Sequence, residues 1–280
     1  LSAVFQRDGD RGRVIKGWCD SDIVSINLQN EQLPLETLAR SNTAENSAVF
    51  QPNGEYIALE SERTGEEQVW LNKQDKTFQL TRFPIDSYVY GIKWSANNNA
   101  LLIGANSGLF HYTLDRVETA IVTSNPILEL LHWDEIEKQA LVFAQFNGIK
   151  KLAKVDLVTG ETVKLTDRQI NWAAQLKNGG IVFTDLMDKF WISNGIEYQL
   201  IDALNEQGGD NKRFLVKDNM IYGVNNAYEL WRYHFDSNNF EIIRSLPKDI
   251  DNISDVQNEN LLVTKRQVAN KEVVELVLSK

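Results

Sequence analysis

The sequence predicts an all-β fold, a β-propeller built from four-stranded antiparallel blades, on three observations. One phrase returns along the 280 residues: an apolar strand, a polar Asn/Asp/Gly turn and a second apolar strand. It returns seven times at a spacing of 39–45 residues, a period typical of propeller blades. An aromatic or aliphatic third strand follows each copy, with a repeated spacing of 38–46 residues of its own. We therefore expect seven blades, with six as the alternative.

The first strand of each unit carries one anchor residue shortly before the turn. In the clearest copy, residues 48–59, the anchor Phe50 precedes the turn Pro52-Asn53-Gly54. Asn and Gly accept the left-handed backbone that tight turns require. Aligned on this copy, the anchors are Phe5, Phe50, Trp94, Trp133, Gln175, Leu215 and Val256.

The second strands are short runs of mostly apolar residues, which indicates that neighbours cover both faces of each blade. They lie at 14–15, 56–59, 100–103, 140–143, 181–183, 220–222 and 261–263. The third strands are anchored at Val24, Trp70, Phe110, Ala153, Trp191, Trp231 and Val274. Six units continue into a fourth strand, at 36–39, 78–81, 119–122, 163–166, 198–201 and 241–244, after turns such as 158–161 and 236–239.

The seventh unit ends at Lys280 after its third strand. We expect its fourth strand either to come from the N-terminus or to be absent, and pairing the two ends of the chain would remove the exposed sheet edge. Residues 1–6 are expected either to close the ring in this way or to form the first strand of the first blade. Residues 201–207 predict at most a short helical turn. We expect residues 1–280 to form a single domain, because each repeat buries its faces against its neighbours.

The composition restricts the possible partners. The formal net charge is −10, which repels phosphate groups, so we expect no direct nucleic-acid binding by this segment. No run approaches the roughly 18 apolar residues of a membrane helix. Cys19 is the single cysteine, which excludes an internal disulfide and a thiolate metal cluster and fits either the cytoplasm or the periplasm.

Catalytic and metal-binding patterns do not emerge from the sequence. The string Gly104-Ala105-Asn106-Ser107-Gly108 has its serine one place too late for a hydrolase nucleophile elbow and is predicted to be a turn. The acidic groups around Asp20 and Asp249 lack the alternation of a calcium loop. The histidines, at 111, 132 and 234, fall on strands of different blades. We therefore expect no catalytic residue, no metal site and no cofactor.

The tryptophans divide into two groups. Trp70, Trp191 and Trp231 share one repeat position, and Trp94 and Trp133 share another, which predicts packing between blades. Trp18 and Trp172 fall outside both registers and are the candidates for ligand binding. Arg63 is a further candidate, although an arginine after a strand is also expected to hold its own hairpin through backbone or carboxylate contacts.

One blade resembles a known repeat. The sequence from Phe50 to Phe83 is similar to the TolB-like propeller repeat, through these segments: Pro52-Asn53-Gly54, residues 56–59, Ser61-Glu62-Arg63-Thr64-Gly65, Val69-Trp70-Leu71 and Gln79-Leu80-Thr81. The fourth unit matches in part, and the others keep only the spacing. Within that family, Gln68-Val69-Trp70-Leu71-Asn72 with residues 79–83 resembles the C-terminal propeller of CadC-like membrane regulators of Gram-negative bacteria.

The resemblance implies a function. CadC-like regulators combine a cytoplasmic winged-helix DNA-binding domain, a transmembrane helix and a periplasmic propeller. It therefore implies a non-enzymatic sensory or protein-interaction propeller in the periplasm, tethered to the inner membrane only through a segment upstream of Leu1. A protein partner or a small-molecule signal is expected on a rim of the propeller. The alternatives are a free periplasmic TolB-like scaffold that binds partner proteins, and the substrate-gating propeller of a serine peptidase.

Overall fold

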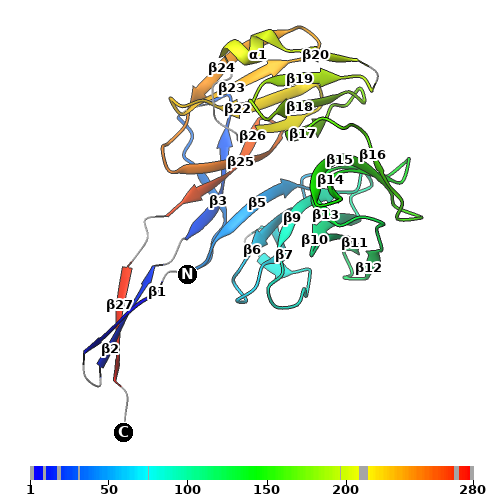
Figure 1. Cartoon of the computed structure of the whole chain (residues 1–280). Coiled ribbons are helices and arrows are strands. Elements are labelled where there is room, and N and C mark those ends of the chain that lie inside the picture. The colour runs from blue at the N-terminus through cyan, green and yellow to red at the C-terminus, as the bar shows by residue number, and fades with distance from the viewer. Residues whose placement is uncertain are drawn as a thin grey trace.

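The chain forms a propeller of six four-stranded antiparallel blades, as a computed structural model shows (Figure 1). The structure describes residues 3–8, 11–17, 20–30, 32–74, 76–195, 197–207, 214–267 and 271–277, with side chains from Asp20 to Gln267. The propeller and its antiparallel blades confirm the predicted fold class. The propeller has six blades, which was the alternative, and the main expectation of seven blades is wrong.

Five blades are built from consecutive strands, each blade running from its inner to its outer strand in chain order. Blade 1 holds β5 (Glu45–Phe50), β6 (Ile57–Ser61), β7 (Gln68–Lys73) and β8 (Lys76–Gln79), and blade 2 holds β9 (Val89–Trp94), β10 (Ala100–Ala105), β11 (Gly108–Thr113) and β12 (Glu118–Ile121). Blade 3 holds β13 (Ile127–Asp134), β14 (Gln139–Phe146), β15 (Ile149–Asp156) and β16 (Thr162–Lys164). Blade 4 holds β17 (Ile170–Gln175), β18 (Ile181–Asp185), β19 (Phe190–Ser193) and β20 (Tyr198–Leu200), and blade 5 holds β21 (Phe214–Lys217), β22 (Met220–Val224), β23 (Glu229–His234) and β24 (Asn239–Ser245).

Blade 6 joins the two ends of the chain. Its inner strands are β25 (Ile250–Gln257) and β26 (Asn260–Arg266), and its outer strands are β3 (Ser21–Asn27) and β4 (Glu36–Ala39). β26 pairs with β3 in an unbroken antiparallel register from Asn260 opposite Asn27 to Arg266 opposite Ser21. The expectation that the N-terminal part of the chain completes the last unit is confirmed, but it supplies two strands rather than one.

The remaining strands explain the corrected blade count. β1 (Ala3–Asp8), β2 (Arg11–Gly17) and β27 (Lys271–Val277) form a separate three-stranded sheet, which stands apart from the blades in Figure 1. β1 pairs only with β2 among the described strands, so the described part of residues 1–6 supplies neither the closing strand nor the first strand of a blade. The units anchored at Phe5 and Val256 each have the strand spacing of a blade, yet their strands divide between blade 6 and this sheet.

Apolar packing between neighbouring blades holds the ring together. The buried core divides into six clusters, and each one joins side chains of two adjacent blades. Ile23 and Leu262 of blade 6, for example, pack with Ala48 and Leu59 of blade 1. The five tryptophans at repeated positions each belong to a different cluster, which confirms their predicted role between blades: Trp70, Trp94, Trp133, Trp191 and Trp231.

Tight turns and one short helix connect the strands. Gly160 and Asn238 have positive φ angles of 76° and 51°, as predicted for the turns that contain them. The expected helical turn is α1 (Asp202–Gln207), between blades 4 and 5. No helix in the described part of the chain has the length and apolar character needed to cross a membrane.

The close approach of Gly223 to Trp231 gives a test of this packing. A Cβ at Gly223 would lie 2.1 Å from Cζ2 of Trp231, whose side chain is fully buried. We expect Gly223→Ala to lower the free energy of unfolding by about 1–3 kcal/mol, as overpacking of a core does. Urea denaturation measures the change. Gly108→Ala is the control, because its nearest neighbour would lie at 3.7 Å; equal effects of the two substitutions would contradict the packing described.

Candidate functional site

The inner strands of all six blades surround the axis of the propeller. Around the ring, β5, β9, β13, β17, β21 and β25 each contact the next. They enclose one cavity of about 330 Å³ and a second of about 490 Å³. We call the two cavities the channel. Residues that line both cavities mark its waist: Val49, Ile92, Lys93, Glu129, Leu130, Trp172, Phe214 and Ser254.

One position of the repeat faces the channel in every blade. The residue directly before each first-strand anchor lines the first cavity in all six blades, and four of the anchors line it as well: Phe50, Trp94, Gln175 and Leu215. The residues directly before the anchors are Val49, Lys93, His132, Ala174, Phe214 and Asp255. They are chemically diverse, whereas the anchors are mostly apolar. Lys93 was not singled out from the sequence, although the repeat alignment contains the signal that would have found it, and His132 was considered only as a candidate metal ligand.

Of the three carboxyl groups that line the channel, Asp255 and Glu129 have cationic partners, and the third is Glu60. Asp255 accepts a hydrogen bond from Lys217 Nζ at 3.0 Å and others from the backbone N–H groups of Phe50, at 2.9 Å, and Val256, at 2.8 Å. Glu129 lies 3.8 Å from Lys150 Nζ. Burial raises the pKa of Glu129, and Lys150 and Lys93 oppose that shift. Both carboxylates are therefore compensated within the protein.

Lys93 is the exception. Its ammonium makes no ion pair and no side-chain hydrogen bond with any described residue, although it lines both cavities. Burial lowers the pKa of Lys93, and the charges of Asp255 and Glu129 only partly counter this. Burial, followed by the charge of Lys93, also lowers the pKa of His132, which favours the neutral imidazole at pH 7. Within the described residues, Lys93 is thus a partly buried cation at the waist whose charge Asp255 and Glu129 offset only in part.

A buried carboxyl group lies at the second cavity. Glu60, on β6, is 7% exposed and lines this cavity together with Ser47. Burial, with a smaller contribution from Glu67, raises the pKa of Glu60 to about 8. The group is therefore protonated at neutral pH and is able to donate a hydrogen bond.

Of the two tryptophans proposed for ligand binding, Trp172 lies at the waist of the channel. Its ring packs edge-on against Phe214, with the ring centroids 5.3 Å apart. Trp172 also contributes to a core cluster, so it serves the packing of blades 4 and 5 as well. Trp18 lies outside the described residues. Ligand binding by either tryptophan stays a prediction.

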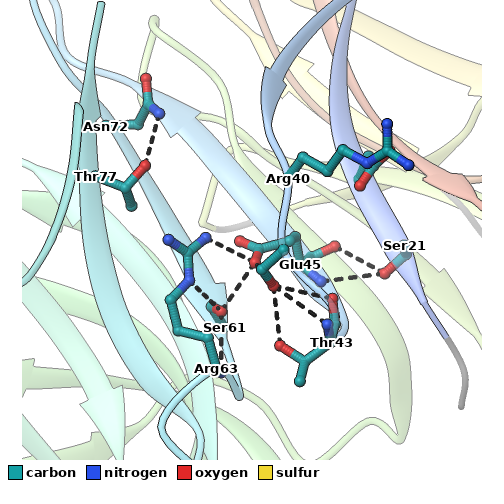
Figure 2. A network of polar contacts seen from close by, with 10 residues as sticks. Ser21, Arg40, Thr43, Glu45, Ser61, Arg63, Asn72 and Thr77 are labelled. Atoms are coloured by element: carbon teal, nitrogen blue, oxygen red, sulfur yellow. Dashed lines mark hydrogen bonds and ion pairs between the residues drawn. The ribbon is translucent and has the colours of Figure 1, made fainter. Parts of the chain in front are cut away.

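Arg63 lies in a polar network around Glu45, between blades 1 and 6 (Figure 2). Its guanidinium donates to Glu45 Oε1 at 2.7 Å and to Ser61 Oγ at 3.1 Å, and it lies over the Trp70 ring at 4.6 Å. Glu45 is fully buried and also accepts hydrogen bonds from Ser41 and Ser61. These contacts are the carboxylate and hairpin contacts expected for Arg63. A ligand role for it stays a prediction.

The acidic and histidine side chains are the groups that could hold a metal ion. Within the described residues, no three or more His, Cys, Asp or Glu side chains group closely enough to hold a metal ion. His111 packs edge-on against Trp133, and His234 lies 3.3 Å from Glu241. Each of these two histidines thus has a structural contact in its own part of the propeller.

Comparison with known proteins establishes the fold. No protein-family model and no curated protein sequence matches the chain. A putative TolB from Agrobacterium tumefaciens superposes with a TM-score of 0.69 at 11% identity, over 90% of this chain and 100% of that one. A chain of the nidogen/laminin complex gives 0.61 at 7% identity over 80% and 93%, and an oligogalacturonate lyase in complex with manganese gives 0.55 at 10% over 95% and 96%. The chain therefore has a TolB-like propeller fold, which enzymes and components of protein complexes share.

The raised pKa of Glu60 predicts a pH-dependent stability. In the unfolded chain this carboxyl group ionises with a pKa near 4.5, but in the folded protein it does so near 8. Folding therefore becomes less favourable as the pH rises through this window, and the loss of stability levels off above it. We expect Glu60→Gln to raise the melting temperature at pH 9 and to leave it nearly unchanged at pH 4. Thermal unfolding at both values tests this, with the exposed Glu137→Gln as control; an equal change at both pH values would contradict it.

The Glu45 network predicts a large loss of stability when Arg63 is removed. Arg63→Met leaves the fully buried Glu45 carboxylate without its cationic partner, and breaking such a pair costs about 3–5 kcal/mol. The free energy of unfolding from urea titration is the measurement. Arg82→Met, at an exposed arginine of the same segment, should change it by less than about 0.5 kcal/mol. Similar losses in the two variants would show that the Glu45 pair is not a stabilising contact.

Proposed function

We propose that this propeller is a non-enzymatic sensory or protein-interaction domain, which takes its ligand or partner at the channel and the loops around it. The observation that carries the proposal is the waist of the channel. There Lys93 lacks a counter-ion among the described residues, and Trp172 and Phe214 present an aromatic pair beside it. An open polar site with one unpaired cation suits binding of a ligand.

The carboxylates that line the first cavity, Asp255 and Glu129, favour binding over catalysis. A general base needs a carboxylate that is free to accept a proton from a substrate. Asp255 already accepts three hydrogen bonds, and Glu129 lies beside Lys150. Binding chemistry is therefore the better match for these groups, although propellers of this fold include a lyase.

The loops on one side of the ring offer a surface for a protein partner. The loop that enters a first strand and the turn that leaves a second strand lie on the same side of an antiparallel blade. On this side, Ile85 and Tyr88 precede β9, and Leu186 and Met187 follow β18; their exposed fractions are 60–79%. The two pairs belong to blades 2 and 4, where they are available to a partner that spans part of this side of the ring.

In its finer form, the proposal makes the chain the periplasmic sensor region of a membrane-anchored transcriptional regulator of a Gram-negative bacterium. Its support is the resemblance of Gln68-Val69-Trp70-Leu71-Asn72 and residues 79–83 to CadC-like propellers. A ligand or partner would shift the association state of the propeller, and the attached membrane helix would transmit that change. The alternative is a free periplasmic scaffold, which the likeness to TolB supports equally. A peptidase gate is the third candidate.

Cell fractionation and transcript profiling distinguish these functions. We expect the full-length protein to stay with the inner membrane after osmotic shock, and an in-frame deletion of residues 20–267 to change the transcripts of a defined set of genes. Release by osmotic shock, together with unchanged transcripts, would refute the regulator and favour the scaffold. Cleavage of peptides or oligogalacturonate by the purified full-length protein would refute the non-enzymatic proposal itself.

A further inference from the structure

We propose that the waist of the channel is a binding site for an organic monocarboxylate that carries an apolar or aromatic group, with Lys93 as its counter-ion and Trp172 and Phe214 as its apolar wall. This inference deepens the proposed function, on which it rests, by naming the chemical class of the ligand. Two properties of the channel carry it, the distribution of its charges and the shape of its lining.

The charges around Lys93 leave it without a counter-ion in the described part of the chain. Asp255 is bonded to Lys217 at 3.0 Å, and Glu129 lies 3.8 Å from Lys150. Lys150 Nζ also donates to the backbone carbonyl of Asn171 at 3.0 Å, which holds it in place. Lys93 has no such contact among the described residues. Lys93 is partly buried, and an ammonium group that loses water contacts without gaining a partner destabilises the folded protein, so packing alone does not account for it.

An anion in the channel would remove this cost, and the same charges restrict which anion fits. Lys93 interacts electrostatically with Asp255 and Glu129, as well as with Lys217. A dianion such as phosphate would be repelled by both carboxylates, with only the Lys93 ammonium available to receive it. A single carboxylate gains the charge-assisted hydrogen bond with the least repulsion. The site is therefore selective for a monoanion.

The other residues that line the waist indicate which substituent the ligand carries next to its carboxylate. Trp172 and Phe214 lie at the same waist, with their ring centroids 5.3 Å apart, and both line each of the two cavities. Their rings offer an apolar contact for a substituent next to the carboxylate. Gln175, beside them in the first cavity, supplies a polar side chain. A cavity of about 330 Å³ has room for a ligand of roughly ten non-hydrogen atoms.

Two sources supply this chemistry: a free small acid, and the C-terminal carboxylate of a peptide with an apolar last residue. Phenylacetate represents the first source and N-acetyl-Gly-Phe the second. Their neutral counterparts, phenylacetamide and N-acetyl-Gly-Phe-amide, keep the shape and remove the charge. Isothermal titration calorimetry of the purified protein with the four compounds tests the proposal. We expect at least one acid to bind with one site per chain. Its amide should bind at least about tenfold more weakly than the acid.

Lys93→Met removes the ammonium and keeps most of the side-chain volume. We expect it to weaken binding of the acid about tenfold or more. Because burial lowers the pKa of Lys93, its charged form opposes folding at neutral pH, so the variant should melt at an equal or higher temperature than the wild type. Lys177→Met, at a lysine whose side chain is 74% exposed, is the matched control and should bind as the wild type does.

Each outcome either tests the proposal or identifies the source of the carboxylate ligand. Binding by the free acid shows that a small molecule is sufficient, and binding by the peptide acid alone assigns the site to a chain terminus. Equal affinity for acid and amide, no binding of either acid at millimolar concentration, or wild-type affinity in Lys93→Met would overturn the proposal. These results are independent of the transcript experiment: a propeller that regulates transcripts but binds no carboxylate refutes only this site, and the reverse result refutes only the regulator.

Discussion

The pairing of β26 with β3 is the interaction on which the rest of the molecule depends. It brings Lys265 opposite Asp22 and Val263 opposite Val24, and so joins the two ends of the propeller into one blade. Without it, β26 and β3 would each present an unpaired edge. The two core clusters on either side of blade 6 would also lose one of their faces, since both contain residues of β3 and β26.

Polar contacts between turns strengthen the closed ring. Gln257 Nε2 of blade 6 donates to the carbonyl of Pro52 in blade 1 at 2.9 Å, and Gln51 Nε2 donates to the carbonyl of Asn98 in blade 2 at 2.6 Å. Asn97 continues the series to Glu135 of blade 3 at 2.8 Å. These turns all join a first strand to a second, so the contacts lie on one side of the propeller. Hydrogen bonds also join blades at the opposite side, from Ser21 Oγ to the carbonyl of Glu45 at 3.0 Å and from the N–H of Ile127 to the carbonyl of Ser107 at 2.9 Å. The ring is thereby held by apolar packing within and by polar contacts at both sides.

The sequence predicts the scaffold much better than the site. Repeat spacing identified the strands, the turns and the five packing tryptophans, because these depend on local patterns and on apolar periodicity. It did not give the number of blades, because pairing partners are set by distant strands: the segment around Val274 has the pattern of a third strand, yet β3 takes that place beside β26. Trp172 was found because it breaks the repeat. Lys93 was missed because its missing counter-ion is a property of the assembled ring.

The residues of the TolB-like motif in blade 1 make structural hydrogen bonds, which explains why the motif says little about function. In blade 1, Gln68 accepts hydrogen bonds from Thr81 Oγ1 and from the backbone of Phe83, both at 2.8 Å, and Thr81 Oγ1 accepts one from the backbone of Val69 at 2.9 Å. The motif residues thus join the third strand to the segment that follows the fourth.

The chemically varied position of the repeat is instead the residue directly before each first-strand anchor. The anchors belong to the packing and stay mostly apolar, whereas the preceding position faces the axis and is free to be Val49, Lys93, His132 or Asp255. Four anchors line the first cavity as well: Phe50, Trp94, Gln175 and Leu215. Chemical variety rather than position alone therefore distinguishes the residue before the anchor. Among the described residues, Asp255 and Glu129 have close cationic partners, whereas no carboxylate is paired with Lys93, and an anion that enters the channel would supply that partner.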